Sequence, residues 1–295
     1  MIPNQFHFVF GLRRQTEPFH LCHYLCIESC YQVNRPDRIF LYYRHEPYGP
    51  YWELAKRRLT LVRVALPRFI WKFRYTGPNR ACRPYRYAHH SDYIRLERLF
   101  ESGGVYADID TIFVQKLPAA LFGESFVLGR EGDIVCQATG RRQPSLCNAL
   151  IMSTPKAAFG RLWLDAFRDA FDGSWSRHST LLPQDLSERS PHLLHIEPSH
   201  SFYKHMWTRE GIRTLLQGYD PDFEGVYSMH LWSHLWWSKA RRDFSDFHAG
   251  LLTKDYIAKV DTTYNVVARA FLPADGPERL GSAWLRRLIG WSGLR

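Results

Sequence analysis

Two carboxylates stand one residue apart in an otherwise apolar stretch, GGVYADIDTIF, over residues 103–113. Asp108 and Asp110 repel each other, and burial of either one is costly unless another group compensates its charge. A divalent cation can do so, because carboxylate oxygens suit Mn²⁺ or Mg²⁺. Residues two apart on a strand point the same way, so the pair can meet one cation at a strand's carboxyl end. A solvated surface loop is the alternative interpretation.

A second group of candidate ligands lies in HLWSHLWWSKA, which begins at His230. His230 and His234 share one face if this stretch is a helix, whereas His230 ends a strand if it is not. Each imidazole either ligates a metal or has a structural role. Trp232, Trp236 and Trp237 either pack in the core or form a platform for a sugar ring, and both interpretations stay open.

Strands and helices alternate along the first part of the chain. We expect strands over 5–11, 38–43 and 59–67, and helices over 18–31 and 89–104. This alternation predicts an α/β fold in which a mostly parallel sheet is flanked by helices.

The carboxylate pair is expected on one strand, GVYADIDTIFV, directly after the helix over 89–104. Ser91 is a candidate cap for the start of that helix. Gly103 and Gly104 permit a sharp turn from helix to strand and the close approach of a ligand. The strand therefore carries the carboxylates to the edge of the sheet.

The second half of the chain continues the α/β pattern. SFVLGR, NALIMST, HLLHIEP and GVYSMHLW are expected strands, and residues 155–171 form an expected amphipathic helix. By contrast, residues 68–88 are rich in Arg, Tyr and Pro and lack periodicity. They predict a long loop, and loops of this length in compact domains are often functional.

Composition and charge narrow the class of protein. The chain has 295 residues, of which 45% are hydrophobic and 23% charged, so it is globular. A net charge of +10 suits phosphorylated ligands, nucleic acid or an anionic membrane. The sequence holds no homeodomain, zinc-finger or RNA-recognition signature, so no nucleic-acid partner is expected.

Cys22, Cys26 and Cys30 recur every four residues and share one helix face. This spacing differs from that of zinc sites, so buried thiols in a reducing compartment are expected. Neither a signal peptide nor an apolar stretch long enough to span a membrane is recognisable. These features predict a cytoplasmic protein.

The run from His89 to Pro118 resembles the glycosyltransferases that carry a sugar-binding Asp-x-Asp motif. This group includes the yeast mannosyltransferase Och1-like proteins, the lactosylceramide 4-alpha-galactosyltransferases and the large clostridial toxins. IPNQFHFVFG, NALIMSTPKAAF and SMHLW resemble other stretches of the same family. The positions that match the family pattern within the run are Ser91, Asp92, Arg95, Gly103, Gly104, Tyr106, Asp108, Asp110, Lys116 and Leu117.

The resemblance implies a GT-A-type single domain. It also implies transfer of a hexosyl or N-acetylhexosaminyl group from a nucleotide-sugar with retention at the anomeric carbon. A UDP-sugar is favoured over a GDP-sugar, and a glycan or lipid-linked glycan is the implied acceptor. Mn²⁺ or Mg²⁺ would be held by Asp108, Asp110 and His230 beneath the diphosphate.

Other roles follow from the same resemblance. Phe10 would stack on the base, and Asp92 and Arg95 would hold ribose and sugar hydroxyls. Asp92 and Arg95 lie three residues apart on the predicted helix, so an internal salt bridge is the structural alternative. Gly104 and Tyr106 complete the implied donor-binding set.

The acceptor and the nucleophile are less well defined. Gln184, Asp185 and Trp232 are candidates for the sugar or acceptor side. The carboxylates of Glu131 and Asp133 are further candidates for the sugar side. A retaining enzyme can use a carboxylate nucleophile, but attack on the front face directed by the departing phosphate needs none. We favour front-face attack as a hypothesis.

Three other functions are alternatives. A haloacid-dehalogenase-type phosphatase also uses an Asp-x-Asp, but DIDTI has Ile112 where that motif wants Thr or Val. A degenerate sugar- or nucleotide-binding protein would lack catalysis, and the intact carboxylate pair argues against it. A toxin-like transferase would instead act on a protein acceptor.

The domain prediction is a glycosyltransferase domain over 1–250 followed by a helical tail over 251–295. Within the domain, residues 1–120 would bind the nucleotide-sugar and residues 121–250 the acceptor. Apolar and basic residues alternate over 277–295, which is typical of a helix lying on a membrane surface or of one packed on the domain. A peripheral position at the inner face of the membrane follows from the first interpretation.

Overall fold

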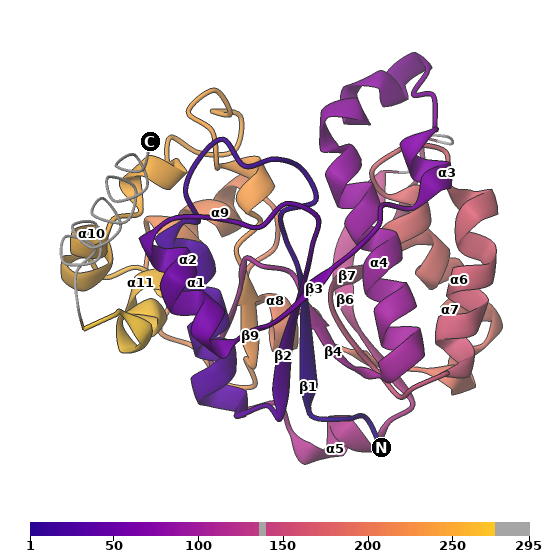
Figure 1. The fold of residues 1–295 in the computed structure, drawn as a ribbon, viewed down its shortest axis with the longest axis horizontal. Helices are drawn as coiled ribbons and strands as arrows, with labels where there is room; N and C mark the ends of the chain where they lie inside the picture. The colour runs from indigo at the N-terminus through magenta and orange to yellow at the C-terminus, as the bar shows by residue number, and fades with distance from the viewer. Residues whose placement is uncertain (136–139, 275–295) are drawn as a thin grey trace, which may run out of the picture.

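The computed structural model describes residues 1–135 and 140–274, and the predicted tail helix over 277–295 lies outside them. A seven-stranded sheet with the order β3-β2-β1-β4-β7-β6-β8 runs through the centre (Figure 1). Its strands are β1 (Gln5–Val9), β2 (Arg38–Tyr43), β3 (Thr60–Arg63), β4 (Gly104–Ala107), β6 (Phe126–Val135), β7 (Arg142–Ser153) and β8 (His195–Glu197).

Four of the six strand pairings are parallel, which confirms the predicted class of a mostly parallel mixed sheet flanked by helices. β3, β2, β1 and β4 run parallel to one another. β7 is antiparallel to both β4 and β6, and β8 is parallel to β6. The chain leaves β1 for β2 on one side and later returns as β4 on the other, so ligand-binding loops are expected to gather at the carboxyl end of β1.

Helices cover both faces of the sheet. In Figure 1, α1 and α2 lie on the left and α4, α6 and α7 on the right. Two apolar cores result, one between each helical layer and the sheet. The α-helices are α1 (Leu21–Ser29), α2 (Pro50–Ala55), α3 (Arg68–Trp71), α4 (Arg86–Ser102), α5 (Ala119–Gly123), α6 (Ala158–Ala170), α7 (Leu182–Arg189), α8 (Ser199–Tyr203), α9 (Arg209–Leu216), α10 (Lys254–Lys259) and α11 (Thr263–Ala268).

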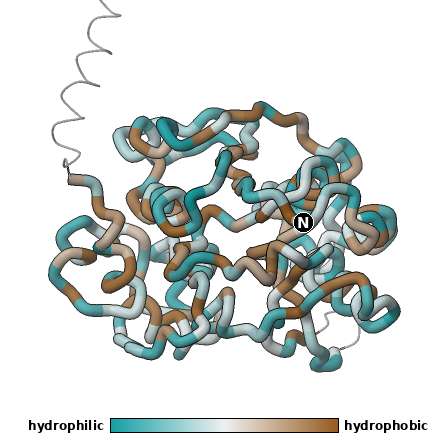
Figure 2. The backbone as a smooth tube through the Cα atoms, turned by 90° about the horizontal axis from the view of Figure 1, so that it is seen from below, coloured by the Kyte–Doolittle hydropathy of each residue, from teal (hydrophilic) through white to brown (hydrophobic). Residues whose placement is uncertain are grey.

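The sequence patterns explain these helices. Cys22 and Cys26 on α1 and Cys30 just after it have no exposed surface and are free thiols, as the four-residue spacing predicts. Phe159 and Phe167 on α6 are also fully buried, in line with the amphipathic pattern. Hydrophobic and hydrophilic residues accordingly alternate in short stretches along the chain (Figure 2). Within the described ranges, no helix is both long and apolar enough to cross a membrane.

The prediction of one strand through the carboxylate pair is wrong. β4 ends at Ala107, and the chain turns where the Thr111 N–H donates to the Asp108 carbonyl at 2.9 Å. β5 (Thr111–Phe113) then pairs with β9 (Ser228–His230) in a separate two-stranded sheet. The turn moves Asp110 away from the main sheet and toward the second half of the chain.

Two further local predictions need correction. Residues 68–88 are not a bare loop, since α3 and a 3₁₀ segment, η3 (Gly77–Tyr85), occupy much of the stretch. α4 begins at Arg86, so Ser91 lies inside the helix and is buried rather than capping it. The aromatic side chains that dock this segment have no regular period, which explains why helical structure was not evident.

The turn from α4 into β4 depends on Gly103 and Gly104, both of which have positive φ. His7 on β1 supports this turn, because its Nε2–H donates to the Gly103 carbonyl at 2.8 Å. The Nδ1 atom then accepts from the Tyr42 hydroxyl at 2.9 Å. A Cβ at residue 104 would lie 2.5 Å from the Gln5 carbonyl oxygen, so the approach of β1 and β4 requires glycine.

We expect Gly104→Ala to destabilise the fold by about 2–4 kcal/mol, because it adds a backbone clash to an unfavourable φ of +107°. Gly77→Ala is the matched control, since φ there is +53° and no atom lies within 4 Å of the added Cβ. That control should lose only about 1–2 kcal/mol. Urea unfolding of both variants gives the comparison, and equal losses would contradict the steric argument.

Acid should weaken the fold through His7. Burial lowers the pKa of His7 to about 4, so the unfolded chain binds a proton at higher pH than the folded protein does. The free energy of unfolding should therefore fall as the pH drops from about 6.5 to 4, by at most about 1.4 kcal/mol per pH unit from this residue.

His7→Gln should reduce that slope, whereas substitution of the exposed His192 by Gln should leave it unchanged. Urea unfolding at several pH values tests this. An undiminished slope in His7→Gln would show that the acid sensitivity arises elsewhere.

Candidate active site

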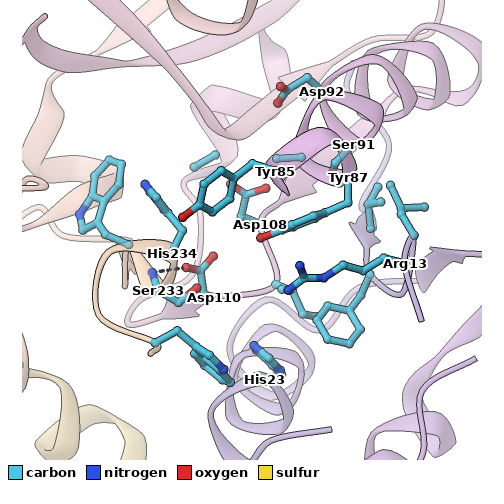
Figure 3. Close-up of a pocket in the computed structure, with 18 of the residues that line it drawn as sticks. Arg13, His23, Tyr85, Tyr87, Ser91, Asp92, Asp108, Asp110, Ser233 and His234 are labelled. Atoms are coloured by element: carbon cyan, nitrogen blue, oxygen red, sulfur yellow. Dashed lines mark hydrogen bonds between the residues drawn. The ribbon is translucent and has the colours of Figure 1, made fainter. Parts of the chain in front are cut away.

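A pocket of about 540 Å³ opens at the carboxyl ends of β1 and β4. Its lining includes residues 9–18 after β1, residues 108–110 after β4 and residues 147–149 of β7. The segment 232–238 after β9 contributes another wall. Figure 3 shows Asp108, Asp110 and His234 facing this space.

The turn after β4 and the pairing of β5 with β9 bring Asp110 and His230 together. The register places Thr111 opposite His230, and the Leu231 N–H donates to the Asp110 carbonyl at 2.9 Å. As a result, His230 Nε2 lies 3.1 Å from Asp110 Oδ1 and 3.5 Å from Asp108 Oδ2. The Ser233 N–H also donates to Asp110 Oδ2 at 2.8 Å.

The ionisation states of Asp110 and His230 depend strongly on each other. Burial raises the pKa of the Asp110 carboxyl, but His230 and the N–H of Ser233 more than offset it, so the pKa lies well below its usual range. Burial lowers the pKa of His230, yet the carboxylates of Asp110 and Asp108 raise it to about 10. A protonated imidazole thus balances part of the negative charge between the two aspartates.

These residues fit a divalent cation. One ligand atom from each of Asp108, Asp110 and His230 lies within 4.8 Å of the others. Two carboxylates and an imidazole are donors that Mn²⁺ accepts, and Mg²⁺ suits the carboxylates. The cation would take over the positive charge that His230 carries, because a ligating imidazole must be neutral.

Asp108 is oriented from behind by two groups. The Tyr106 hydroxyl donates to its Oδ1 at 2.5 Å, and Arg95 Nη2 lies 3.2 Å from the same oxygen. The Arg95 guanidinium also lies over the Tyr106 ring, 4.4 Å from its centroid. Asp108 keeps 24% of its side chain exposed, so its second oxygen remains available to the pocket.

Asp92 is held by a buried network. Arg95 Nη2 lies 3.1 Å from its Oδ1, and the Asn148 side-chain amide donates to the same atom at 2.9 Å. His178 Nε2 donates to Oδ2 at 3.0 Å. Burial raises the pKa of Asp92, but Arg95 and His178 outweigh it and lower the pKa. The predicted salt bridge with Arg95 therefore exists, and both residues also line the pocket.

Aromatic and cationic side chains line one side of the pocket. Phe10 and His23 have ring centroids 4.9 Å apart, and His23 stacks on Trp237 at 4.8 Å. The Arg13 guanidinium lies 4.3 Å from the centroid of Tyr87. Figure 3 shows Tyr87 and Arg13 reaching into the same space. This side suits a flat ring with an anionic substituent.

The opposite side is formed by Trp175 and its neighbours. Trp175 stacks on His234 at 4.9 Å and contacts Tyr85 edge-on at 5.7 Å. Arg241 donates to the Tyr85 hydroxyl at 3.2 Å and to the His234 carbonyl at 3.3 Å. An aromatic wall beside a polar floor suits a sugar ring.

Glu131 also lines the pocket, and its Oε2 has no hydrogen-bond partner within the described chain. Burial raises its pKa to about 7, with the positive charge of His230 acting in the opposite direction. Glu131 is thus a protonatable group beside the carboxylates. Asp133, its alternative in the sequence, is exposed and does not line the pocket.

Four predicted site residues do not line the pocket. Gly104 and Tyr106 lie behind it, where they shape the turn and orient Asp108. On α7, the Gln184 side chain accepts a hydrogen bond from Arg130, and the Asp185 carboxylate accepts one from Arg177. Both side chains are therefore engaged outside the pocket. The predicted residues that do line it are Phe10, Asp92, Arg95, Asp108, Asp110, His230 and Trp232.

Trp232 lines the pocket beside His230, with ring centroids 4.2 Å apart and nearly perpendicular planes. Its φ of +53° is unusual for a bulky residue and bends the chain so that Ser233 reaches Asp110. The indole N–H donates to the His205 carbonyl. Trp232 therefore supports the carboxylate group as well as facing the pocket.

Sequence reasoning missed several pocket residues. Asn148 lies in the NALIMST stretch, whose family resemblance could have pointed to it. His178 has no such signal, because it reaches Asp92 only through the three-dimensional fold. Tyr87 and Trp175 were also missed as lining residues, since aromatic type alone does not separate pocket from core.

Tyr106→Phe should keep the fold, cost about 1 kcal/mol of stability and weaken divalent-metal binding about tenfold, because it frees Asp108 from its orienting hydroxyl. Calorimetric titration with Mn²⁺ measures the affinity. Tyr219→Phe, at a residue 51% exposed, is the matched control. Unchanged Mn²⁺ affinity in Tyr106→Phe would reject this positioning role.

Comparison with known proteins agrees with the geometry. Residues 74–127 match the family model described as a glycosyltransferase sugar-binding region containing a DXD motif. Over 245 residues the chain is 30% identical to glucan organizing enzyme 1 of Cryptococcus neoformans var. grubii serotype A. The alignment covers 80% of this chain and 63% of that protein, so the chain spans less than two thirds of the relative's length.

Two solved glycosyltransferases are similar in outline. GlyE of Streptococcus pneumoniae TIGR4 is 11% identical with a TM-score of 0.48, over 98% of this chain and 64% of GlyE. The PaToxG glycosyltransferase is 18% identical with a TM-score of 0.40, over 64% of this chain and 70% of that one. Within the matched residues 74–127, Asp108 and Asp110 occupy the DXD motif of the glycosyltransferase sugar-binding region that the chain resembles.

Proposed function

We propose that this protein is a metal-dependent retaining glycosyltransferase that uses a nucleotide-sugar, with a UDP-sugar favoured over a GDP-sugar. The observation that carries the proposal is the cluster of Asp108, Asp110 and His230 at the floor of a pocket with two aromatic sides. The group transferred would be a hexosyl or N-acetylhexosaminyl residue. Residues 1–120 would supply most of the donor site, and residues 121–250 most of the acceptor site.

Different residues would bind different parts of the nucleotide-sugar. Asp108, Asp110 and His230 would hold Mn²⁺ or Mg²⁺, which supplies Lewis-acid stabilisation for the departing diphosphate. Phe10, which lines the pocket, would stack on the base. Arg13 can approach a phosphate from the same side, and Asp92 and Arg95 can bind sugar hydroxyls.

Transfer needs one bond to form and one to break. An acceptor hydroxyl oxygen would bond to the anomeric carbon while the bond from that carbon to the diphosphate oxygen breaks. Attack from the face of the leaving group retains configuration, and the hydroxyl proton then passes to the departing phosphate. Glu131, with a pKa near 7, could hydrogen-bond the sugar or acceptor as either an acid or a base.

A polysaccharide acceptor is favoured. The matched relative is named for organising glucan, which supports a glycan or lipid-linked glycan over a protein. The aromatic wall at Trp175 and Tyr85 offers a surface on which an acceptor sugar ring can stack. A protein acceptor and a non-catalytic sugar-binding role are the alternatives.

Asp110→Asn should abolish metal-dependent nucleotide binding and lower transfer by more than the roughly 10- to 100-fold typical of outer-shell partners. Thermal unfolding with Mn²⁺ and UDP, GDP, CMP or ADP identifies the nucleotide. A ligand at about 100 times its Kd adds roughly 2.7 kcal/mol of stability to the wild type. Asp255→Asn, at an exposed position of α10, is the matched control.

The outcomes separate the candidate functions. A Mn²⁺-dependent shift of the thermal midpoint with UDP, lost only in Asp110→Asn, supports the proposal. Slow hydrolysis of the UDP-sugar without acceptor would show catalysis as well as binding. A shift without any hydrolysis or transfer favours the non-catalytic role. No shift with any nucleotide contradicts the assignment of Asp108 and Asp110.

A further inference from the structure

The positive charge of the chain is concentrated in one segment. Residues 54–91 contain ten Lys and Arg residues and no Asp or Glu, while the net charge of the whole chain is +10. The rest of the chain is therefore neutral on balance. Glu28 and Glu46 reach in from outside to pair with Arg58 and Lys56 at the start of this segment.

The remaining cations of the segment have no such partners. No ion pair within the described chain involves any of them, and seven are exposed to solvent: Arg57, which precedes β3, and six that lie from the end of β3 onward. These six extend from the carboxyl end of β3 through α3 into η3. They are Arg63, Arg68, Lys72, Arg74, Arg80 and Arg83.

The segment is firmly docked despite its charge. Ile70 is fully buried, and Phe69 packs edge-on against Phe167 of α6 at 6.2 Å. Phe73 packs on Phe171 at 4.8 Å, and the Asn79 side chain donates to the Asp172 carbonyl at 2.9 Å. The apolar side chains thus face the domain and leave the cations outside.

Trp71 is the exception among the apolar side chains of α3. It is 57% exposed, although other tryptophans, such as Trp52 and Trp163, are almost completely buried. Arg68 and Lys72 flank it in sequence, and Arg168 of α6 lies over the neighbouring Phe69 ring at 5.7 Å. An exposed indole among unpaired cations suits the boundary between lipid headgroups and acyl chains.

The segment also protrudes. In Figure 1 the chain between α3 and α4 rises at the top right, above the carboxyl ends of the central strands. The segment ends just before the pocket, because the pocket lining includes Pro84 and Tyr85 but none of residues 63–83. A convex basic surface fits a flat anionic layer better than a single polymer chain, which would need a groove.

We propose that the basic segment, residues 63–83, docks the protein on an anionic lipid bilayer with Trp71 entering the headgroup region. Each unpaired Lys or Arg near such a surface adds to the attraction, and the attraction falls within a Debye length. Docking here would hold the pocket mouth beside the membrane, since Tyr85 follows directly on the segment. None of residues 63–83 lines the pocket, and none belongs to the tail over 277–295.

The test is co-sedimentation of the full chain with vesicles of phosphatidylcholine alone or with 30% phosphatidylserine, the latter content being about that of an anionic leaflet. We expect binding only to the anionic vesicles, and loss of binding as salt rises to about 0.5 M. Arg68→Glu with Lys72→Glu should reduce the partition at least tenfold. Trp71→Ala should reduce it about threefold or more without changing its dependence on salt.

A charge-matched control uses two exposed cations outside the basic segment. Arg38 begins β2 and Lys116 follows β5, both are exposed, and Glu at both positions changes the net charge equally. Thermal midpoints of all variants verify folding. Equal loss of vesicle binding in the two double variants would show that only the net charge matters, and this would overturn the proposal.

Two other results would also overturn it. If both double variants bind as the wild type does, another part of the chain, such as residues 277–295, is responsible. If the wild type binds a soluble acidic polysaccharide such as heparin but not the anionic vesicles, the partner is an acidic glycan. UDP-dependent thermal shifts of these variants should match the wild type in every case, which separates this test from that of the transfer site.

Discussion

The balance of charge around three carboxylates is the constraint on which the rest of the site depends. Asp92, Asp108 and Asp110 line one pocket, and two of them are almost fully buried. Each has its own cationic or polar support: Arg95 lies between Asp92 and Asp108, and His230 contacts Asp110. Without these groups, the desolvation cost of the carboxylates would oppose folding.

The backbone follows from the same requirement. β4 must deliver Asp108 beside Arg95 of α4, so helix and strand meet through two glycines with positive φ. β5 must carry the chain away from the main sheet, so that His230 can approach from β9. The turn at Asp108 is therefore both the end of one sheet and the entry to the other.

Much of this arrangement could be predicted from local sequence. β2 has the predicted bounds of residues 38–43, because a run of apolar and aromatic residues is bounded by turn residues. The burial of Cys22, Cys26 and Cys30 and the approach of His230 to the carboxylates were also anticipated. The family resemblance contributed the latter, since no periodicity links residues 110 and 230.

What could not be predicted depends on contacts between distant segments. The strand through Asp108 and Asp110 looks continuous in sequence, but β9 competes with the main sheet for residues 111–113. Gln184 resembles a pocket residue by type, yet Arg130 holds it elsewhere. His178 enters the Asp92 network from a π-helical turn that no sequence pattern indicates.

The pairing of β5 with β9 also has a consequence for biosynthesis. Asp110 and His230 are 120 positions apart, so a nascent chain exposes the acidic turn long before its imidazole partner leaves the ribosome. During that interval the remaining strands of the main sheet, β6, β7 and β8, are synthesised, while residues 111–113 remain an unpaired edge. Completion of the second sheet is thus the step that converts a repulsive pair of aspartates into a finished site.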